Sequence, residues 1–323
     1  MRVYTCLVSR RIWSEMLPYA DLRAPEVLGL LRRFGVELLV AVRPWDLASL
    51  PSLLAACVDH GVAAAAWPMV EDRDGRWASA RNAVLFRDFT MRVRDASAKE
   101  IAIDLEPPID DVRALMSGVG GAARALRSGV TLAEFAKARG VYVAMADELR
   151  AQGVATTAAV LPHALLDDGE THDRGARWQR LAGTPVDGPA FDRYSVMLYT
   201  SMVEGWSRGL LDRADARAVL AGACRLTVER FGVAGGVSLG AVDTGAFGDE
   251  PIYRDVSELR DDVAIARACG VEEIALFDLA GVLARKPAEA WLAALVETEA
   301  GEARPPKSLR AHALRALVKW AKG

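Results

Sequence analysis

Residues 25–42 read PEVLGLLRRFGVELLVAV, and this stretch contains one complete helix-and-strand unit. Pro25 suits the first turn of a helix, and Gly35 suits the position just past its end. The run at 37–42 that follows is almost wholly apolar, which is typical of a buried strand. A helix followed at once by a buried strand indicates a parallel α/β sheet.

The same alternation of strand and helix recurs along most of the chain. Helix boundaries are marked by a capping box at Thr131 and Glu134, by cap residues Asp212 and Ser257, and by Pro287. The expected strands are the runs 3–8, 37–42, 62–67, 100–105, 154–161, 195–199, 237–242 and 273–277. Eight alternating units predict an α/β fold, a (β/α)8 TIM barrel with an extra C-terminal helix.

An open, doubly wound sheet is the competing architecture. Its dinucleotide-binding form needs a glycine-rich turn after the first strand. We interpret residues 9–13 as that turn, and they contain no glycine. The glycines at 118–121 follow a helical stretch instead, so we interpret them as a flexible connection.

Length and composition are consistent with one large domain. The chain has 323 residues, of which 52% are hydrophobic and 26% charged, and this balance excludes intrinsic disorder. We assign residues 1–303 to the barrel. Residues 304–323 are expected to form a Pro-Pro linker and a basic amphipathic helix, which packs on the barrel or, alternatively, lies on a membrane surface or a partner.

Charge and cysteine patterns exclude several classes of function. Forty basic and 43 acidic residues give a net charge of -3, so we expect no nucleic-acid partner. The longest apolar stretches are too short to span a membrane. The four cysteines form no C-x-x-C pair and are expected to be reduced, packed thiols. No signal peptide is seen, so we expect a cytoplasmic protein, or a secreted one if a leader was trimmed; the oligomeric state is left open.

The carboxyl ends of the strands are where a barrel of this kind carries its chemistry. The fourth strand ends in Asp104-Leu105-Glu106, and side chains two residues apart on a strand face the same way. Two close carboxyl groups in an apolar setting do not both ionise easily, so one can serve as a general acid. This is what glycoside hydrolysis needs. The alternative is that Glu106 is a solvated loop residue paired with a basic side chain.

Other strand ends offer side chains that suit sugar binding. The rings of Trp45 and Trp67 can stack on apolar sugar faces, although packing is the alternative role. Arg43, Asp243 and Asp278 can hydrogen-bond hydroxyl groups or, equally, form ion pairs. A carbohydrate is therefore the expected ligand.

Two strand ends resemble a known enzyme family. Residues 101–106 resemble the end of the chitinase-like glycosidase signature D-x-x-D-x-D-x-E, which lies on the fourth strand of a barrel. Met197-Leu198-Tyr199-Thr200 resembles the M-x-Y-D/N motif of the same family, and Phe277 stands where the family has a tryptophan. The two earlier aspartates of the signature are replaced by Lys99 and Ala102.

The resemblance implies a retaining, substrate-assisted glycosidase that acts on N-acetylhexosamine-containing glycans. It implies that Glu106 protonates the glycosidic oxygen, that Asp104 orients and stabilises the attacking N-acetyl group, and that Tyr199 hydrogen-bonds the acetamido oxygen. It places Phe277 in the substrate-binding site, and it implies neither a cofactor nor a catalytic metal.

Two other functions stay open from the sequence. One is a metal-dependent barrel enzyme such as a sugar isomerase, with ligands drawn from Asp104, Glu106, His163, Asp243 and Asp278. The other is a non-catalytic barrel that binds carbohydrate, since a fold does not fix a function.

Overall fold

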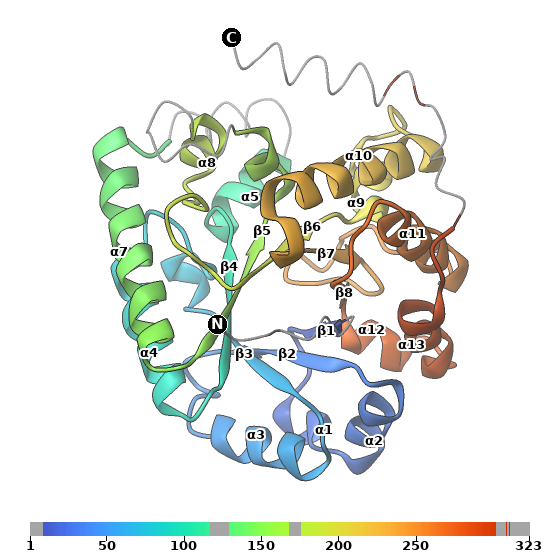
Figure 1. Cartoon of the computed structure of the whole chain (residues 1–323), viewed down its shortest axis with the longest axis horizontal. Helices are drawn as coiled ribbons and strands as arrows, with labels where there is room; N and C mark the ends of the chain where they lie inside the picture. The colour runs from blue at the N-terminus through green and yellow to red at the C-terminus, as the bar shows by residue number, and fades with distance from the viewer. Residues whose placement is uncertain (1–8, 117–128, 168–175, 302–307, 309, 311–323) are drawn as a thin grey trace. The chain divides into compact units, whose positions relative to one another are not determined.

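The computed structural model describes residues 9–116, 129–167, 176–301, 308 and 310. Eight strands form a closed barrel in chain order, which confirms the predicted (β/α)8 TIM barrel (Figure 1). The strands are β1 Arg10–Ser14, β2 Glu37–Val42, β3 Ala64–Pro68, β4 Glu100–Leu105, β5 Ala155–Val160, β6 Arg193–Met197, β7 Gly235–Gly240 and β8 Ile274–Phe277.

Helices follow the strands in sequence. The α-helices are α1 Tyr19–Leu22, α2 Pro25–Phe34, α3 Leu50–Asp59, α4 Ala83–Asp95, α5 Ile109–Met116, α7 Leu132–Ala151, α8 Arg177–Ala182, α9 Thr200–Trp206, α10 Arg213–Phe231, α11 Val256–Ala268, α12 Leu279–Ala284 and α13 Ala288–Glu297. Short 3-10 turns are η1 Asp72–Asp74, η2 Pro162–Leu166 and η3 Gly232–Ala234. In the described part of the chain, no helix combines the length and apolar character that crossing a membrane requires.

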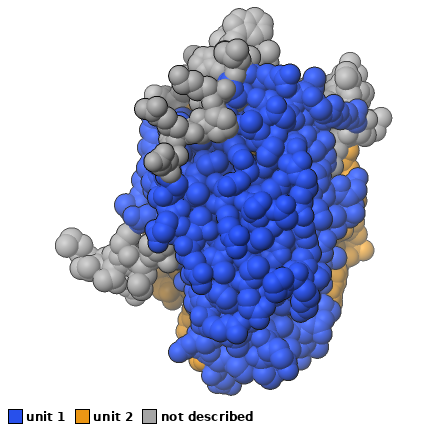
Figure 2. All heavy atoms as spheres, turned by 90° about the vertical axis from the view of Figure 1, so that its right-hand side faces the viewer, with its two compact units in different colours: residues 1–38, 59–63, 198–323 blue, residues 39–58, 64–197 orange. Residues whose placement is uncertain are grey.

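Contacts within the chain define two compact units, coloured blue and orange in Figure 2. Unit 1 comprises residues 1–38, 59–63 and 198–323, and unit 2 comprises residues 39–58 and 64–197. In unit 2, α4 and α7 pack against each other beside the strands (Figure 1). In unit 1, α11 packs against both α10 and α13.

The strands form the core because both of their faces are covered. Strand β4 pairs in parallel with β5 from Glu100 opposite Ala155 to Leu105 opposite Val160, and residues 101–105 are all buried. Strand β7 pairs with β8, ending at Gly240 opposite Phe277. Strands buried on both faces are the expected result when helices cover the outside and side chains fill the inside.

Most of the predicted helix boundaries are confirmed. Helix α2 runs from Pro25 to Phe34 with Gly35 as its C-cap residue, and α7 begins with the capping box of Thr131 and Glu134. Asp212 caps α10 as expected. The prediction for α11 was wrong by two residues, because Asp255 rather than Ser257 is its N-cap and accepts a hydrogen bond from the Ser257 amide.

The first strand was predicted in the wrong place. The run 3–8 lies outside the described residues, and the segment interpreted as a turn, 9–13, belongs largely to β1. The strand was not recognised because it begins with two charged residues. Arg11 can be buried because its guanidinium lies 3.2 Å from Glu37 and 3.6 Å from Glu273. Arg10 donates a hydrogen bond to the Leu295 carbonyl at 3.1 Å.

Smaller corrections concern the ends of other strands. Strand β6 ends at Met197, two residues before the predicted end, so Tyr199 is the N-cap residue of α9. The glycines at 118–121 and nearly all of the predicted C-terminal linker and helix lie outside the described residues. Ser308 is described, and its hydroxyl donates to Asp215 at 2.5 Å. Cys57, Cys224 and Cys269 are free thiols, the first two of them buried.

Candidate active site

Asp104 and Glu106 lie at the carboxyl end of β4, in unit 2. Asp104 is 2% exposed, and Glu106 is half-buried. The extended pairing continues past the strand, because the Ala78 amide donates to the Asp104 carbonyl at 2.8 Å and the Glu106 amide donates to the Ala78 carbonyl at 3.2 Å. With the backbone extended through Glu106, both side chains belong to the same face of the strand.

A cavity of about 200 Å³ opens immediately after Glu106, and we call it the Trp178 cavity. Its walls are lined by Ser79, Arg81, Pro107, Pro108, Asp111, Gly129, Val130, Leu161, His163, Trp178, Leu181, Ala182 and Gly183. A larger hollow of about 1010 Å³ lies among η1, α4, α5 and α7. Neither Asp104 nor Glu106 is among the described residues that line the two cavities, but Pro107, which follows Glu106, lines the smaller one.

His163 is a neutral wall of the Trp178 cavity. Its Nε2 atom lies 3.0 Å from Thr184 Oγ1, and loss of solvent around the ring lowers the pKa of His163 to about 4. The imidazole is therefore uncharged at neutral pH. In the described part of the chain, no three His, Cys, Asp or Glu side chains are arranged to hold a metal ion.

Arg43 and Trp45 follow the carboxyl end of β2. The Arg43 guanidinium lies 2.7 Å from Asp72 and 4.9 Å from the centre of the Trp45 ring, in cation–π contact. Arg76 binds the same carboxylate at 2.9 Å. Partial burial opposes ionisation of Asp72, but the two arginines outweigh it and hold the pKa of Asp72 below its usual value. Arg43 is thus part of an ion-pair network.

The two predicted sugar-binding tryptophans differ in exposure. Trp45 is 66% exposed, whereas Trp67, at the end of β3, is 4% exposed. An exposed ring backed by a guanidinium is a suitable surface for stacking. The structure therefore favours Trp45 for ligand contact and gives Trp67 a packing position.

Tyr199 and Phe277 form an aromatic pair in unit 1. Their ring centroids are 5.6 Å apart, and the ring planes are inclined at 32°. Gly240 makes the pairing possible, because a Cβ there would lie 2.7 Å from the Phe277 carbonyl oxygen and 3.3 Å from Tyr199 Cδ1. The resemblance predicted both residues at the ligand site, and the structure brings them into contact.

Asp278 follows Phe277 directly and is fully buried. Its Oδ1 atom accepts a hydrogen bond from the Gly281 amide at 3.0 Å, at the start of α12. Burial, and to a lesser extent the charges of Glu15 and Asp243, raise the pKa of Asp278 to about 7. Glu15 and Asp243 thus lie near enough to Asp278 for their charges to act on it, and Asp278 carries a proton for much of the time at neutral pH.

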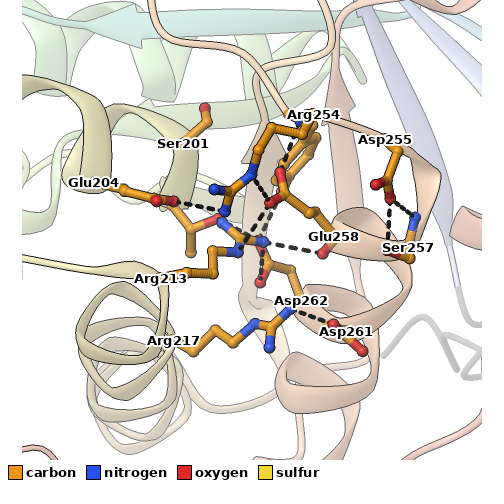
Figure 3. Close-up of polar contacts among 12 residues, drawn as sticks. Ser201, Glu204, Arg213, Arg217, Arg254, Asp255, Ser257, Glu258, Asp261 and Asp262 are labelled. Atoms are coloured by element: carbon orange, nitrogen blue, oxygen red, sulfur yellow. Dashed lines mark hydrogen bonds and ion pairs between the residues drawn. The ribbon is translucent and has the colours of Figure 1, made fainter.

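A buried polar network holds the segment that follows Tyr199 (Figure 3). At its centre is Asp262 of α11, which is fully buried. Its carboxylate accepts hydrogen bonds from Thr200, from the Tyr253 hydroxyl at 2.9 Å and from Arg213 at 3.0 Å. Burial raises the pKa of Asp262, and the positive charge of Arg213 opposes that shift. The network joins the first residue of α9 to α10 and α11.

Ser201 adds a second tie between α9 and β7. Its hydroxyl donates to the Gly240 carbonyl at 3.0 Å and accepts from the Ala241 amide at 2.8 Å. Around these residues, Arg254 binds Glu258 at 2.6 Å and Glu204 at 3.2 Å (Figure 3). The backbone that carries Tyr199 is therefore fixed to its neighbours within unit 1.

The predicted residues consequently fall into two groups, one in each unit. Unit 2 holds Arg43, Trp45, Trp67, Asp104 and Glu106, and unit 1 holds Tyr199, Asp243, Phe277 and Asp278. Sequence reasoning missed Glu15 because β1 was assigned too early in the chain. The signal was present in Ile12-Trp13-Ser14-Glu15, where a short strand with apolar residues is followed by a carboxylate, as β4 is followed by Glu106.

Comparison with known proteins bears on the fold. The structure resembles the PgaB (BpsB) glycoside hydrolase domain from Bordetella bronchiseptica, with a TM-score of 0.53 and 12% identity over 90% of this chain and 99% of the other. It also resembles a chitinase from Chromobacterium violaceum, with a TM-score of 0.50 and 13% identity over 89% and 97% of the two chains.

A third similar structure is the class V chitinase from Nicotiana tobaccum, with a TM-score of 0.50 and 10% identity over 88% and 98% of the two chains. No protein-family profile and no curated protein matches the sequence. At such low identity, these likenesses establish the barrel fold, and function has to be argued from the residues themselves.

Proposed function

We propose that the chain is a glycoside hydrolase that acts on N-acetylhexosamine-containing glycans by a retaining, substrate-assisted mechanism. The observation that carries this proposal is the pair of carboxyl groups, Asp104 and Glu106, on one face of the end of β4, directly before the Trp178 cavity. Glycoside hydrolase and chitinase barrels among the similar structures support the same reaction class.

Glu106 is the proposed general acid. It is half-buried, so it can reach a ligand and still have a partly desolvated carboxyl group. In the first step its proton passes to the glycosidic oxygen as the bond to the anomeric carbon breaks. The carbonyl oxygen of the sugar's own acetamido group forms the new bond to that carbon, so no enzyme nucleophile is needed.

Asp104 is the proposed partner of the acetamido group. When the carbonyl oxygen attacks, positive charge develops on the acetamido group, and a carboxylate that is 2% exposed interacts with such a charge far more strongly than one in water. In the second step, Glu106 takes a proton from water, and the water oxygen replaces the acetamido oxygen at the anomeric carbon. Two displacements at one carbon retain its configuration.

Some of the remaining predicted residues receive binding roles in this proposal. The role that the resemblance implies for Tyr199, a hydrogen bond to the acetamido oxygen, stays a prediction; within unit 1 its ring packs against Phe277. Trp45 offers an exposed ring for stacking, and Arg43 and Asp243 are proposed to bind hydroxyl groups. Asp278 is fully buried and receives no ligand contact in this proposal.

The test is hydrolysis of a chromogenic N-acetylglucosamine oligomer by wild type, Glu106→Gln and Asp104→Asn. Loss of the acid should lower kcat by about 10²- to 10⁴-fold while binding is kept, because the amide has the shape of the acid but no proton to give. Glu26→Gln, an exposed position on α2, is the matched control and should be as active as wild type.

Three outcomes would contradict the proposal. Equal activity of Glu106→Gln and wild type would remove Glu106 from the mechanism. Wild type that binds the oligomer and never cleaves it would favour a carbohydrate-binding barrel. Activity that is lost on chelation and restored by a divalent ion would favour the metal-dependent isomerase type of enzyme.

A further inference from the structure

Helices α10 and α11 pack side by side in unit 1, and two contacts between them show that they run in the same direction (Figure 1). Arg213, the first residue of α10, lies 3.0 Å from Asp262 of α11 (Figure 3). About two turns further along both helices, the carbonyl oxygen of Ala221 accepts a hydrogen bond from the Cys269 thiol at 3.5 Å. An equal advance along both helices keeps them in register.

This register brings a second cysteine, Cys224, to the same place. Residues of an α-helix are turned by about 100° from one to the next, so Cys224 lies only about 20° around α10 from Arg213. By the same rule, Cys269 lies about 20° around α11 from Asp262. Because Arg213 and Asp262 contact each other, both cysteines lie on the facing sides of the two helices. Cys224 is also one turn from Ala221, which Cys269 contacts, so the two thiols lie close to each other.

The charges of the two thiols act on each other, which agrees with this placement. Burial raises the pKa of the Cys224 thiol well above its usual value, and the negative charge of a Cys269 thiolate raises it further. Burial also raises the pKa of Cys269, and the positive charge of Arg225 opposes the shift at both thiols. Coulomb repulsion weakens with distance, so an interaction of this kind belongs to neighbouring groups.

The two thiols differ in their access to solvent. Cys269 is half-buried just past the end of α11, whereas Cys224 is fully buried in α10. A small oxidant can therefore reach Cys269 first, with Cys224 already beside it. An accessible thiol next to a second, resolving thiol is the arrangement found in redox-sensing proteins. Cys57, the remaining free thiol of the described residues, belongs to unit 2.

We propose that Cys224 and Cys269 form a reversible disulfide, which joins α10 to α11 when the protein meets hydrogen peroxide. In the first step the Cys269 sulfur attacks one peroxide oxygen, the O–O bond breaks, and a sulfenic acid and one water are formed. In the second step the Cys224 sulfur attacks the Cys269 sulfur, and the S–OH bond breaks. The hydroxyl group leaves as a second water with the proton of the Cys224 thiol. The two thiols thus give two electrons to the peroxide, and a dithiol reductant restores them.

The disulfide would reinforce the buried network that holds the segment after Tyr199. Asp262 binds Thr200 and Arg213, and its negative charge also acts on Cys224. A covalent link between α10 and α11 restricts the unfolded chain, so the oxidised form should be the more stable one. The link forms whether or not the chain cleaves glycans.

The experiment treats the folded full chain with hydrogen peroxide, blocks the free thiols and digests the protein with trypsin for mass spectrometry. Trypsin cuts after arginine, so Cys224 falls in the peptide 218–225 and Cys269 in the peptide 268–285. The two peptides should be joined, and dithiothreitol should separate them. Thermal unfolding of the oxidised chain should occur at a temperature higher by on the order of 5 °C than that of the reduced chain.

Matched variants assign these changes to the thiol pair. Cys269→Ala and Cys224→Ala should each abolish the joined peptides and the rise in unfolding temperature. Cys57→Ala removes a buried thiol of the other unit and should keep both. Arg225→Gln removes the charge that favours both thiolates, so it should slow oxidation without changing the product. Thermal unfolding of each reduced variant checks that it is folded.

The proposal is overturned if peroxide leaves the peptides 218–225 and 268–285 separate. It is overturned equally if Cys269 joins Cys6 or Cys57, or if Cys269 is oxidised to a sulfinic acid while Cys224 stays reduced, because the two thiols then do not form a pair. Joined peptides that also appear with Cys57→Ala, and that disappear with Cys269→Ala, support it.

Discussion

The rings of Tyr199 and Phe277 lie 5.6 Å apart, in contact across the space that a side chain at Gly240 would need. Gly240 pairs with Phe277 in the β7–β8 ladder, and a Cβ at this position would lie 2.7 Å from the Phe277 carbonyl oxygen. The glycine is therefore required by close packing of backbone and ring.

Gly240→Ala is expected to destabilise the fold by about 1–3 kcal/mol, because neither the carbonyl oxygen nor the packed ring can move freely. Urea unfolding measures the change. Gly29→Ala is the matched control, since nothing lies within 4 Å of a Cβ there and alanine favours the helix α2. It should raise stability by about 0.5–1 kcal/mol. Equal effects of the two substitutions would show that Gly240 is not under steric constraint.

Asp262 and its sequence neighbour Asp261 give a second matched comparison. Asp262→Ala removes the buried acceptor of Thr200, Tyr253 and Arg213, and the guanidinium it leaves behind should cost about 3–5 kcal/mol. Asp261 pairs with Arg217 at the surface, so Asp261→Ala should cost less than about 1 kcal/mol. Chemical denaturation measures the free energy of unfolding of both variants. If the two variants lose similar amounts of stability, the buried network around Asp262 contributes no more than the surface ion pair of Asp261.

The raised pKa of Asp278 predicts a stability that falls with rising pH. In the unfolded chain this carboxyl ionises near about 3.9, whereas in the folded chain its pKa is raised to about 7. Between these values the folded state holds a proton that the unfolded state has lost. The free energy of unfolding therefore decreases as pH rises through this window, by an amount on the order of 4 kcal/mol for this group.

Asp278→Asn should flatten that dependence, because the amide can still accept from the Gly281 amide but does not titrate. Urea unfolding at about pH 5 and about pH 8 measures the difference in slope. Asp21→Asn, at an exposed position on α1, should follow the wild-type dependence. If the free energy of unfolding changes with pH in the same way for Asp278→Asn and the wild type, Asp278 has an ordinary pKa in the folded chain.

Trp45 is expected to separate binding from stability. It is 66% exposed, so Trp45→Ala should change the free energy of unfolding by less than about 0.5 kcal/mol. Loss of a stacking surface should weaken the binding of chitobiose, the dimer of N-acetylglucosamine, by about 3- to 10-fold. Val58→Ala, which removes an exposed apolar side chain from α3, should change neither quantity. If Trp45→Ala binds chitobiose as tightly as the wild type, the Trp45 ring does not contact the sugar.

The periodic parts of the fold could be predicted from the sequence because their signals are local. Strand 100–105 was predicted with its observed bounds, and so was 37–42. The caps at Thr131 and Asp212 are short-range backbone contacts, and a few residues suffice to specify them. The strand β1 was missed because Arg10 and Arg11 are charged, and the partners that allow their burial, Leu295, Glu37 and Glu273, are more than 20 residues away.

The sequence by itself determined the barrel, through eight alternating apolar and amphipathic segments, and it placed Asp104 and Glu106 at the end of the fourth strand. The tertiary structure alone decided the rest. The contact of Tyr199 with Phe277, the raised pKa of Asp278 and the hydrogen bonds of Asp262 to Thr200 and Tyr253 all depend on residues that the sequence does not place side by side. The physical reason is that desolvation and hydrogen-bond satisfaction are properties of a three-dimensional neighbourhood, which local sequence patterns do not contain.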